Sequence, residues 1–333
     1  MQHKYYETIQ KMGNASYDPQ RGRFLLTFPV EESGVPGEIK TFLLSPGFCM
    51  HCIDIHSKKT LDFSSAMVEN VQVLKINYCS HGRCELELHN GEYTYLTGGE
   101  IAIDVGQAKE SFGYPSANYE GLEFLIHMDE GWQNTFQVLG SEITAPEILA
   151  QNCARHSQPQ IAHAEDTVAR IAREIREYVD ADQDNILIAI KALELLFTLQ
   201  HMSFSATDLR RTYYTTTQVD IAKAVQALIT QDLSVRYTAK DLAKRFRISE
   251  SSLKNYFRSV YGCGYAEYQN EQRMKKAAAL LEKGSEKVVE IAGSIGYASQ
   301  AKFGVAFKAY YGVTPLEYRR NATLSRLSKE EKK

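Results

Sequence analysis

The chain has 333 residues, of which 44% are hydrophobic and 24% are charged. This balance is typical of a folded protein with two or three domains, and it excludes a chain that is disordered throughout. No stretch approaches the roughly 20 consecutive apolar residues of a membrane span, and the first residues lack the apolar segment of a secretory leader. We therefore expect a cytoplasmic protein without membrane contact, in which the six cysteines are reduced.

The net charge of −3 is unevenly distributed along the chain. Residues 216–333 carry 21 basic and 12 acidic side chains, which gives +9. The preceding residues carry 17 basic and 29 acidic side chains, which gives −12. A basic domain attached to an acidic one indicates nucleic-acid binding at the basic end, because phosphate contacts release counterions. A basic surface that serves only solubility is the alternative at this point.

Residues 1–130 are predicted to form an antiparallel β domain. Short runs of β-type residues alternate with Gly, Pro, Asn and Ser, and they are GRFLLTF, KTFLLS, VQVLKINY, CELELHNGEYTYL, GEIAIDV and GLEFLIH. In the fourth run, Asn90-Gly91 predicts a hairpin with a type I′ turn. Such strands indicate a sandwich, jelly roll or small barrel, which can hold one small ligand. The aromatic residues expected to line this effector pocket are Phe42, Tyr93, Tyr95 and Phe124.

Residues 131–204 are predicted to be helical. Val168, Ile171, Ile175 and Val179 recur at helical spacing and indicate an amphipathic helix. The next segment, NILIAIKALELLFTLQHMSF, is apolar nearly all round, so it is either interior to its domain or packed against a partner helix as well. We favour a helix that joins two copies of the chain, followed by a linker at residues 205–217. Its dimerisation stripe comprises Ile186, Ile190, Leu193 and Phe197.

The basic end contains an internal repeat. The first copy, KDLAKRFRISESSLKNYFRSVYG, covers residues 240–262, and the second, VEIAGSIGYASQAKFGVAFKAYYG, covers residues 289–312. Both begin with an acidic residue, an aliphatic residue and alanine, and both end in Phe-basic-x-x-Tyr-Gly. Each copy fits a helix-turn-helix. Between them, strong helix formers predict one helix over residues 265–283, about 28 Å long at about 1.5 Å per residue.

The turns and helix starts of the two copies can also be predicted. Thr238, with an acidic residue three positions later, is typical of a capping box, and Ser249 and Ser299 are placed to cap the second helices. The second turn contains Gly296, whereas the first has Arg247 at the matching position. A non-glycine residue in the left-handed conformation costs roughly 1–2 kcal/mol, so the first turn is predicted to be strained or differently shaped.

Residues 218–320 resemble the AraC/XylS transcription regulators. The resemblance is carried by the two copies, by Arg273-Met274-x-x-Ala277 and by the run from Gly312 to Arg319, GVTPLEYR. It implies paired helix-turn-helix motifs on promoter DNA, an activator that works with RNA polymerase, and control by a small ligand. The N-terminal half looks like the family's jelly-roll regulatory domain in architecture. The expected fold class is thus α+β, with a charged tail at residues 321–333.

Carried over residue by residue, the resemblance implies two recognition helices with different surfaces. The first places Ser251, Lys254 and Asn255 in the major groove, with Ser252 and Arg258 near phosphates. The second presents Gln300, Ala301, Lys302 and Val305, and it departs from the family pattern at Gly304, so it is expected to read fewer bases. Asn can bond an adenine edge and Lys a guanine edge, each worth roughly 1–3 kcal/mol of discrimination. An ordinary solvated helix face is the alternative for each polar residue.

Cysteine and histidine cluster in the N-terminal half, at Cys49-Met50-His51-Cys52, His56, Cys79, His81 and Cys84. Residues 49 and 52 of a strand point to opposite faces, which disfavours a zinc site, so we interpret these residues as buried thiols and surface histidines and expect no metal or cofactor. A regulator that responds to metal or thiol redox chemistry remains an alternative. The other alternative, a β-domain enzyme fused to a DNA-binding module, lacks phosphate-loop, nucleophile-elbow and metalloprotease motifs.

Overall fold

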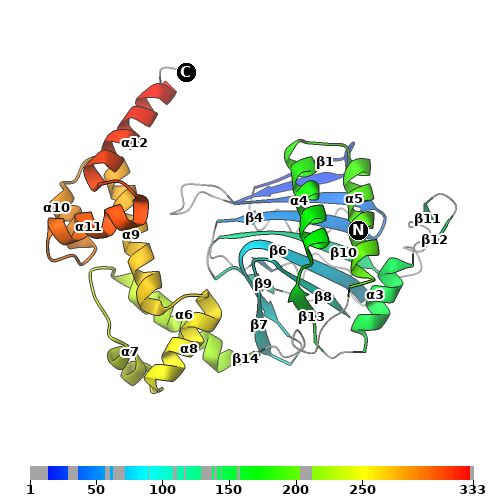
Figure 1. Ribbon diagram of the computed structural model, residues 1–333, viewed down its shortest axis with the longest axis horizontal. Coiled ribbons are helices and arrows are strands. Elements are labelled where there is room, and N and C mark those ends of the chain that lie inside the picture. Colours follow the sequence, from blue (N-terminus) through cyan, green and yellow to red (C-terminus); the bar gives the residue numbers. More distant parts are fainter. Residues whose placement is uncertain are drawn as a thin grey trace. The chain divides into compact units, whose positions relative to one another are not determined.

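The computed structural model describes residues 14–28, 37–56, 61–62, 72–88, 90–107, 111–115, 118–128, 137–138, 141–142, 144–155, 158–202 and 212–330. The chain divides into two compact units, Met1–Thr215 and Thr216–Lys333. Among the described residues, the first consists mainly of antiparallel strands with three helices, and the second consists of helices (Figure 1). The α+β class predicted from the sequence is therefore confirmed.

The strands of the first unit form one continuous antiparallel arrangement. One path runs in the order β1-β2-β3-β4-β10-β6-β8-β13, and the other joins β5, β9, β6, β7 and β14. The strand bounds are β1 Asn14–Asp18, β2 Arg23–Thr27, β3 Glu38–Ser45, β4 Phe48–Ile55, β5 Leu61–Asp62, β6 Gln72–Glu87, β7 Glu92–Thr97, β8 Glu100–Gln107, β9 Ser111–Gly113, β10 Tyr119–His127, β13 Gln160–His163 and β14 Tyr214–Thr215, with β11 Gln137–Val138 and β12 Ser141–Glu142 as a separate pair.

Strand β6 belongs to both paths and turns the corner between them. Residues 72–79 pair with β8 and residues 83–87 pair with β7. Between these parts lies Gly82, whose φ is 82°. A Cβ at this position would lie 1.8 Å from the backbone oxygen of Asn118. Glycine is therefore required here both by the backbone conformation and by the close approach of the neighbouring loop.

The hairpin predicted at Asn90-Gly91 is present, but its turn is not type I′. Leu88 N donates to Glu92 O at 2.8 Å, so three residues lie between the last paired positions. Gly91 has a φ of 78°, whereas Asn90 is not among the described residues with positive φ. A three-residue loop with one left-handed glycine connects the two strands. It does so without placing Asn90 in the left-handed conformation that a type I′ turn requires.

The longer sheet path is buried on both faces. On β4, Phe48, Met50 and Cys52 join the cluster that includes the helices of this unit, whereas Ile53 and Ile55 join a cluster on the opposite face. The helices are α3 Ala145–Cys153, α4 Asp166–Asp180 and α5 Asn185–Leu199. Figure 1 shows α4 and α5 running side by side across the strands. Such two-sided burial explains why the strand is apolar at almost every position rather than at alternate ones.

Part of the segment predicted to be helical is not. Residues 131–204 contain β13, in which Ile161 pairs with Ala102 of β8 and both side chains enter the same cluster. A run of four residues such as QIAH is too short for its periodicity to distinguish a strand from a helix. Its pairing with a distant strand decides that it is a strand. The dimerisation stripe does lie on a helix, since Ile186, Ile190, Leu193 and Phe197 all fall within α5.

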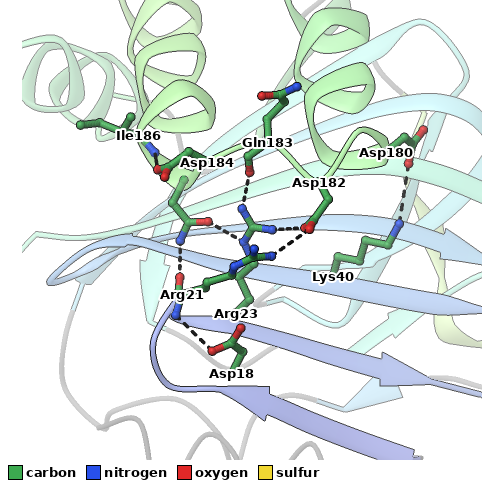
Figure 2. A network of polar contacts seen from close by, with 10 residues as sticks. Asp18, Arg21, Arg23, Lys40, Asp180, Asp182, Gln183, Asp184 and Ile186 are labelled. Atoms are coloured by element: carbon green, nitrogen blue, oxygen red, sulfur yellow. Dashed lines mark hydrogen bonds and ion pairs between the residues drawn. The ribbon is translucent and has the colours of Figure 1, made fainter.

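A network of charged residues fastens the turn between α4 and α5 to the β1–β2 hairpin (Figure 2). Arg21 donates to Asp182 at 2.8 Å, and Arg23 donates to Asp182, to the backbone oxygen of Gln183 and to Asn185. Asp182 has a φ of 51°, a left-handed conformation that Asp tolerates better than most side chains. The two arginines thus hold the start of α5 in place through a turn that is itself backbone-strained.

The second unit comprises seven helices among its described residues. They are α6 Thr216–Gln231, α7 Ala239–Phe246, α8 Glu250–Tyr261, α9 Tyr265–Lys283, α10 Val288–Ser294, α11 Gln300–Tyr311 and α12 Pro315–Glu330. Helix α9 has the predicted bounds, with α6 to α8 gathered at one end and α10 to α12 at the other (Figure 1).

Two expected boundaries differ. Residues 205–217, expected as a linker, end in β14 and the start of α6; residues 203–211 lie outside the described residues. The expected charged tail, residues 321–333, begins as a continuation of α12. No helix among the described residues is long and apolar enough to span a membrane.

Candidate nucleic-acid interface

The first helix-turn-helix consists of α7 and α8, and its ends are capped as predicted. Thr238 Oγ1 accepts a hydrogen bond from Asp241 N at 3.1 Å, and the Asp241 carboxylate accepts one from Thr238 N at 3.2 Å, which completes a capping box. Ser249 Oγ accepts from Ser252 N at 3.0 Å. Arg247 ends α7 with a φ of 56°, so the predicted strain is present in this turn.

The second motif, α10 and α11, has the same plan with different residues at the turn. Ser299 Oγ accepts from Lys302 N at 3.3 Å, and the Glu290 carboxylate accepts from Lys287 N at 2.9 Å. The turn contains Gly296, with a φ of 80°. A Cβ on Gly296 would lie 2.4 Å from the backbone oxygen of Ser234. The second turn therefore requires glycine for space as well as for conformation, whereas the first accommodates arginine.

The two recognition helices are anchored in matching ways. Phe257 of α8 contacts Tyr268 of α9 edge to face at 5.6 Å, and Phe307 of α11 contacts Tyr318 of α12 at 5.4 Å in the same geometry. Both phenylalanines are fully buried. Both members of the second pair lie 50 positions after their counterparts in the first pair, so the repeat extends into the helix after each motif. Such edge-to-face packing adds to the burial energy and fixes the angle of each recognition helix.

A buried arginine joins the loop before the first motif to the connecting helix. Arg273 of α9 donates from Nε to Leu233 O at 2.7 Å and from Nη2 to Val235 O at 2.9 Å. Gln269 donates to Ile229 O at 3.0 Å and also to Val235 O. Burial lowers the pKa of Arg273, and Arg236 nearby acts in the same direction. The arginine in the Arg273-Met274-x-x-Ala277 stretch is thus a structural anchor whose donors bind backbone oxygens.

The residues predicted to face DNA all lie on α8 or α11. Ser251, Lys254, Asn255 and Arg258 are exposed on α8, and Ser252 is half-buried. The residues on α11 are also exposed, namely Gln300, Ala301, Lys302 and Val305. The inward side of α8 holds Leu253 and Phe257. The exposed side chains are therefore not part of the helical core.

The hydroxyl groups at the start of α8 are partly engaged within the helix. Ser249 Oγ lies 2.8 Å from Ser251 Oγ and donates to Ser252 Oγ at 2.9 Å. These three hydroxyl groups lie at the N-terminal end of α8. The N-terminal end of a helix attracts phosphate.

The four aromatic residues expected to line one effector pocket do not lie together. Phe42 and Phe124 belong to the cluster that packs beneath the helices of the first unit. Tyr95 lies on β7, where its hydroxyl donates to Glu85 at 2.9 Å and its ring lies 5.9 Å from that of Tyr214. Tyr93 pairs with Tyr214 in the register of β7 and β14. The pocket set is therefore split between two places because strand alternation directs these rings away from the shared interior.

A row of polar side chains crosses the sheet on the face opposite the helices. Thr41 of β3, His51 of β4, Glu123 of β10 and Asn77 of β6 occupy consecutive paired positions, and all are buried. His51 lies between Met50 and Cys52, and Glu123 lies between Leu122 and Phe124, whose side chains all join the cluster beneath the helices. The polar row therefore points the other way. In the sequence, Lys75 and Asn77 stand at alternate positions of VQVLKINY, whereas Glu123 stands alone among apolar neighbours in GLEFLIH.

Hydrogen bonds satisfy most of this row, but Glu123 differs. Thr41 Oγ1 lies 2.7 Å from His51 Nδ1, and Tyr119 OH donates to Asn77 Oδ1 at 2.7 Å. Glu123 is 5% exposed, and Lys75 is its charged neighbour on β6. Burial raises the pKa of Glu123 to about 7, against the influence of Lys75. Burial also lowers the pKa of His51 to about 4, so this ring is neutral at pH 7.

The cysteines of the first unit are dispersed and unreactive in character. Cys49 packs with Val73 and Leu125, whereas Cys52 joins the cluster beneath the helices. Burial raises the pKa of the Cys49 thiol to about 12 and that of Cys52 to about 11. Thiols that stay protonated at neutral pH are poor nucleophiles and poor metal ligands. Within the described ranges, no group of three or more His, Cys, Asp or Glu side chains is arranged to hold a metal ion.

Comparison with known proteins agrees with the geometry of the second unit. Residues 242–321 match the family described as a helix-turn-helix domain. The chain is 35% identical over 94 residues to a protein of Streptomyces lividans described as an AraC-like transcription regulator, covering 28% of this chain and 31% of that relative. The likeness thus spans less than a third of that relative's length.

A longer match is weaker in identity. The chain is 24% identical over 249 residues to the transcriptional regulator GadX of Escherichia coli O127:H6, covering 73% of this chain and 84% of that protein. Among solved structures, the DNA-binding domain of AdpA, in complex with a target DNA, is 28% identical with a TM-score of 0.30, covering 32% of this chain and 95% of that one. The second unit, with its two helix-turn-helix motifs, is thus similar to the DNA-binding part of AraC-like transcription regulators.

Proposed function

We propose that both recognition helices, α8 and α11, read base edges in successive major grooves of one DNA duplex. The observation that carries this proposal is the repeated scaffold, in which two matched motifs are attached to opposite ends of α9. The connecting helix spans about 28 Å, close to the roughly 34 Å turn of B-DNA. The net charge of +9 over residues 216–333 supplies the attraction for phosphates.

Within this proposal, Lys254 and Asn255 read bases from α8 while Ser252 and Arg258 bind phosphates. On α11, Gln300 and Lys302 are the polar readers. Their side chains are exposed on the same helices whose opposite sides are fixed by Phe257 and Phe307. Helices that are held rigidly by their inner faces can place outer side chains with the accuracy that base recognition requires.

The test is a binding experiment with the full chain on duplexes selected from a random-sequence pool, compared with scrambled versions at two salt concentrations. We expect a selected duplex to bind tighter than its scrambled form at both salts, and Lys254→Ala to reduce the difference by roughly 1–3 kcal/mol. Lys276→Ala is the matched control, because Lys276 is an exposed lysine on the connecting helix. Equal and steeply salt-dependent binding of both duplexes would contradict base reading.

We further propose that the chain acts as a homodimer through α5. Ile186 and Ile190 are 66% and 55% exposed, Phe197 is also exposed, and Leu193 is half-buried beside them. Exposed large apolar side chains that recur along one helix are typical of a protein contact surface. A second copy of the same helix is the proposed occupant, because a twofold contact offers each stripe an identical apolar partner.

We also propose that a small-molecule effector binds on the polar face of the β domain and controls DNA binding. Glu123 supports this proposal, because burial of its carboxyl group is costly and a bound molecule that donates a hydrogen bond would offset that cost. The expected effector therefore carries a hydrogen-bond donor such as an amine or hydroxyl group. Thermal unfolding of the full chain with a panel of amines, sugars and short carboxylates tests this. A stabilising compound should lose its effect in Glu123→Gln, and a panel without any stabilising compound would count against the proposal.

The sign of regulation follows only from the family resemblance, and we propose activation through contact with RNA polymerase. Transcription in vitro from a promoter that carries the selected duplex measures it directly. A rise in transcript on addition of the chain is expected, and a fall would establish repression. No observation favours an enzymatic role.

A further inference from the structure

The two recognition helices can be aligned residue by residue through their buried sides. Leu253 and Phe257 of α8 correspond to Phe303 and Phe307 of α11, each 50 positions later, and all four are at most 1% exposed. Both helices begin one residue after a capping serine and end at a left-handed glycine. The same offset therefore aligns their outer faces.

This alignment places apolar residues of α11 where α8 has polar ones. Lys254 corresponds to Gly304, and Asn255 corresponds to Val305. Ser251 corresponds to Ala301 in the same way. Two hydrogen-bonding side chains on the outer face of the first helix are thus replaced by a hydrogen atom and an isopropyl group in the second.

Packing within the protein does not explain this replacement. Val305 is 74% exposed, the highest value among the exposed large hydrophobic side chains of the described residues. A Cβ on Gly304 would meet no described atom within 4 Å, and its φ is not in the left-handed region. Alanine would therefore fit at 304 and would favour the helix by about 1 kcal/mol. The pair leaves an open, apolar surface that the fold itself does not use.

We propose that Val305, beside the open surface at Gly304, recognises the 5-methyl group of thymine. The thymine methyl is the apolar group that a standard base pair presents in the major groove, so an apolar side chain without donors selects it. Lys302 and Lys308 are exposed on the same helix, and this positive charge favours DNA over a protein surface as the occupant. The operator then has two unlike halves, one read by hydrogen bonds from α8 and one in which a methyl contact from α11 adds to the polar readers.

This inference rests on the proposed recognition of bases by α8 and α11. The experiment distinguishes failure of the methyl contact from failure of base recognition. In the duplex selected for tightest binding by the full chain, each thymine is replaced in turn by deoxyuridine, which lacks only the methyl group. We expect one or two positions in one half-site to weaken binding about fourfold, which corresponds to the roughly 0.8 kcal/mol of one buried methyl group. The Val305→Ala variant should bind the thymine and deoxyuridine duplexes with nearly equal affinity.

Val289→Ala is the matched control, because Val289 is a 53% exposed valine on α10. It should keep the full sensitivity to deoxyuridine. Specific binding in which no deoxyuridine position matters, or in which Val305→Ala keeps the sensitivity of the wild type, overturns the methyl contact and leaves base reading intact. The absence of any specific duplex overturns both. Val305 would then be assigned to a protein contact instead.

Discussion

The two units use their buried polar groups differently. In the second unit, buried Gln269 and Arg273 bind backbone oxygens, and the functional candidates Lys254, Asn255 and Lys302 lie on the outside. In the first unit, charged and polar groups such as Glu123 are buried within the sheet, while a large apolar stripe on α5 is exposed. The difference teaches that one unit is built to present chemistry to a large charged partner, and the other keeps its chemistry inside.

Truncation of a buried aromatic side chain should produce the largest loss of stability. This loss should be confined to the second unit. We expect Phe307→Ala to destabilise that unit by about 3–5 kcal/mol, since the ring is fully buried and contacts Tyr311 and Tyr318. Urea unfolding followed by circular dichroism of the full chain measures this. Loss of β-sheet signal at the same denaturant concentration as helix signal would show that the two units do not unfold independently.

The buried carboxyl group should make the first unit depend on pH. In the folded state the pKa of Glu123 is raised from 4.5 to about 7, so the folded protein binds the proton more tightly than the unfolded chain. Stability is therefore lost as the pH rises from about 4.5 to about 7. Glu123→Gln should be more stable than the wild type by roughly 3 kcal/mol above about pH 7 and nearly equal to it near pH 4.5. A constant difference in urea midpoint across this range would contradict the assignment.

His51 should oppose that trend. Its pKa is lowered from 6.5 to about 4, so the unfolded chain binds the proton more tightly, and stability is lost as the pH falls from about 6.5 to about 4. The two slopes partly cancel between about pH 4.5 and 6.5. In His51→Gln, we expect the Glu123 slope to appear alone over that window. The same pH series of urea midpoints checks it, and a variant with the flat profile of the wild type would argue against opposing titrations.

The exposed apolar stripe of α5 can be tested as the proposed contact between two copies of the chain. Ile190→Lys should convert a dimer into a monomer with little change in unfolding, because the side chain is largely exposed within one chain. Sedimentation velocity measures the oligomeric state. Val289→Lys introduces the same charge at a similarly exposed valine of the second unit and should leave the dimer intact. A monomeric wild type would remove the proposed role of the stripe.

The smallest effect is expected at the turn of the first motif. Arg247→Gly should stabilise the second unit by about 1 kcal/mol, because glycine adopts a φ of 56° without the cost that arginine incurs. The gain should be visible in thermal unfolding of the full chain. A loss of stability instead would show that the side chain of Arg247 makes a contribution that outweighs its backbone strain.

The sequence predicted the second unit far better than the first. The bounds of α9, the capping roles of Thr238, Ser249 and Ser299, and the left-handed Arg247 were all predictable, because each depends on residues within a few positions. In the first unit, β13 was missed and the turn at Asn90 was assigned wrongly. Both depend on how a short segment meets a distant strand, which local pattern does not record.

The sequence by itself determined that this chain carries two helix-turn-helix motifs, because helix capping, helix periodicity and a repeated motif are local or self-similar signals. Only the tertiary structure decided which side of each strand meets the helices. Alternation along a strand separates two faces but does not show which of them the helices cover, and here both faces are buried. For that reason Phe42 and Phe124 were expected around a ligand and lie beneath α4 and α5, whereas Glu123 and His51 occupy the opposite face.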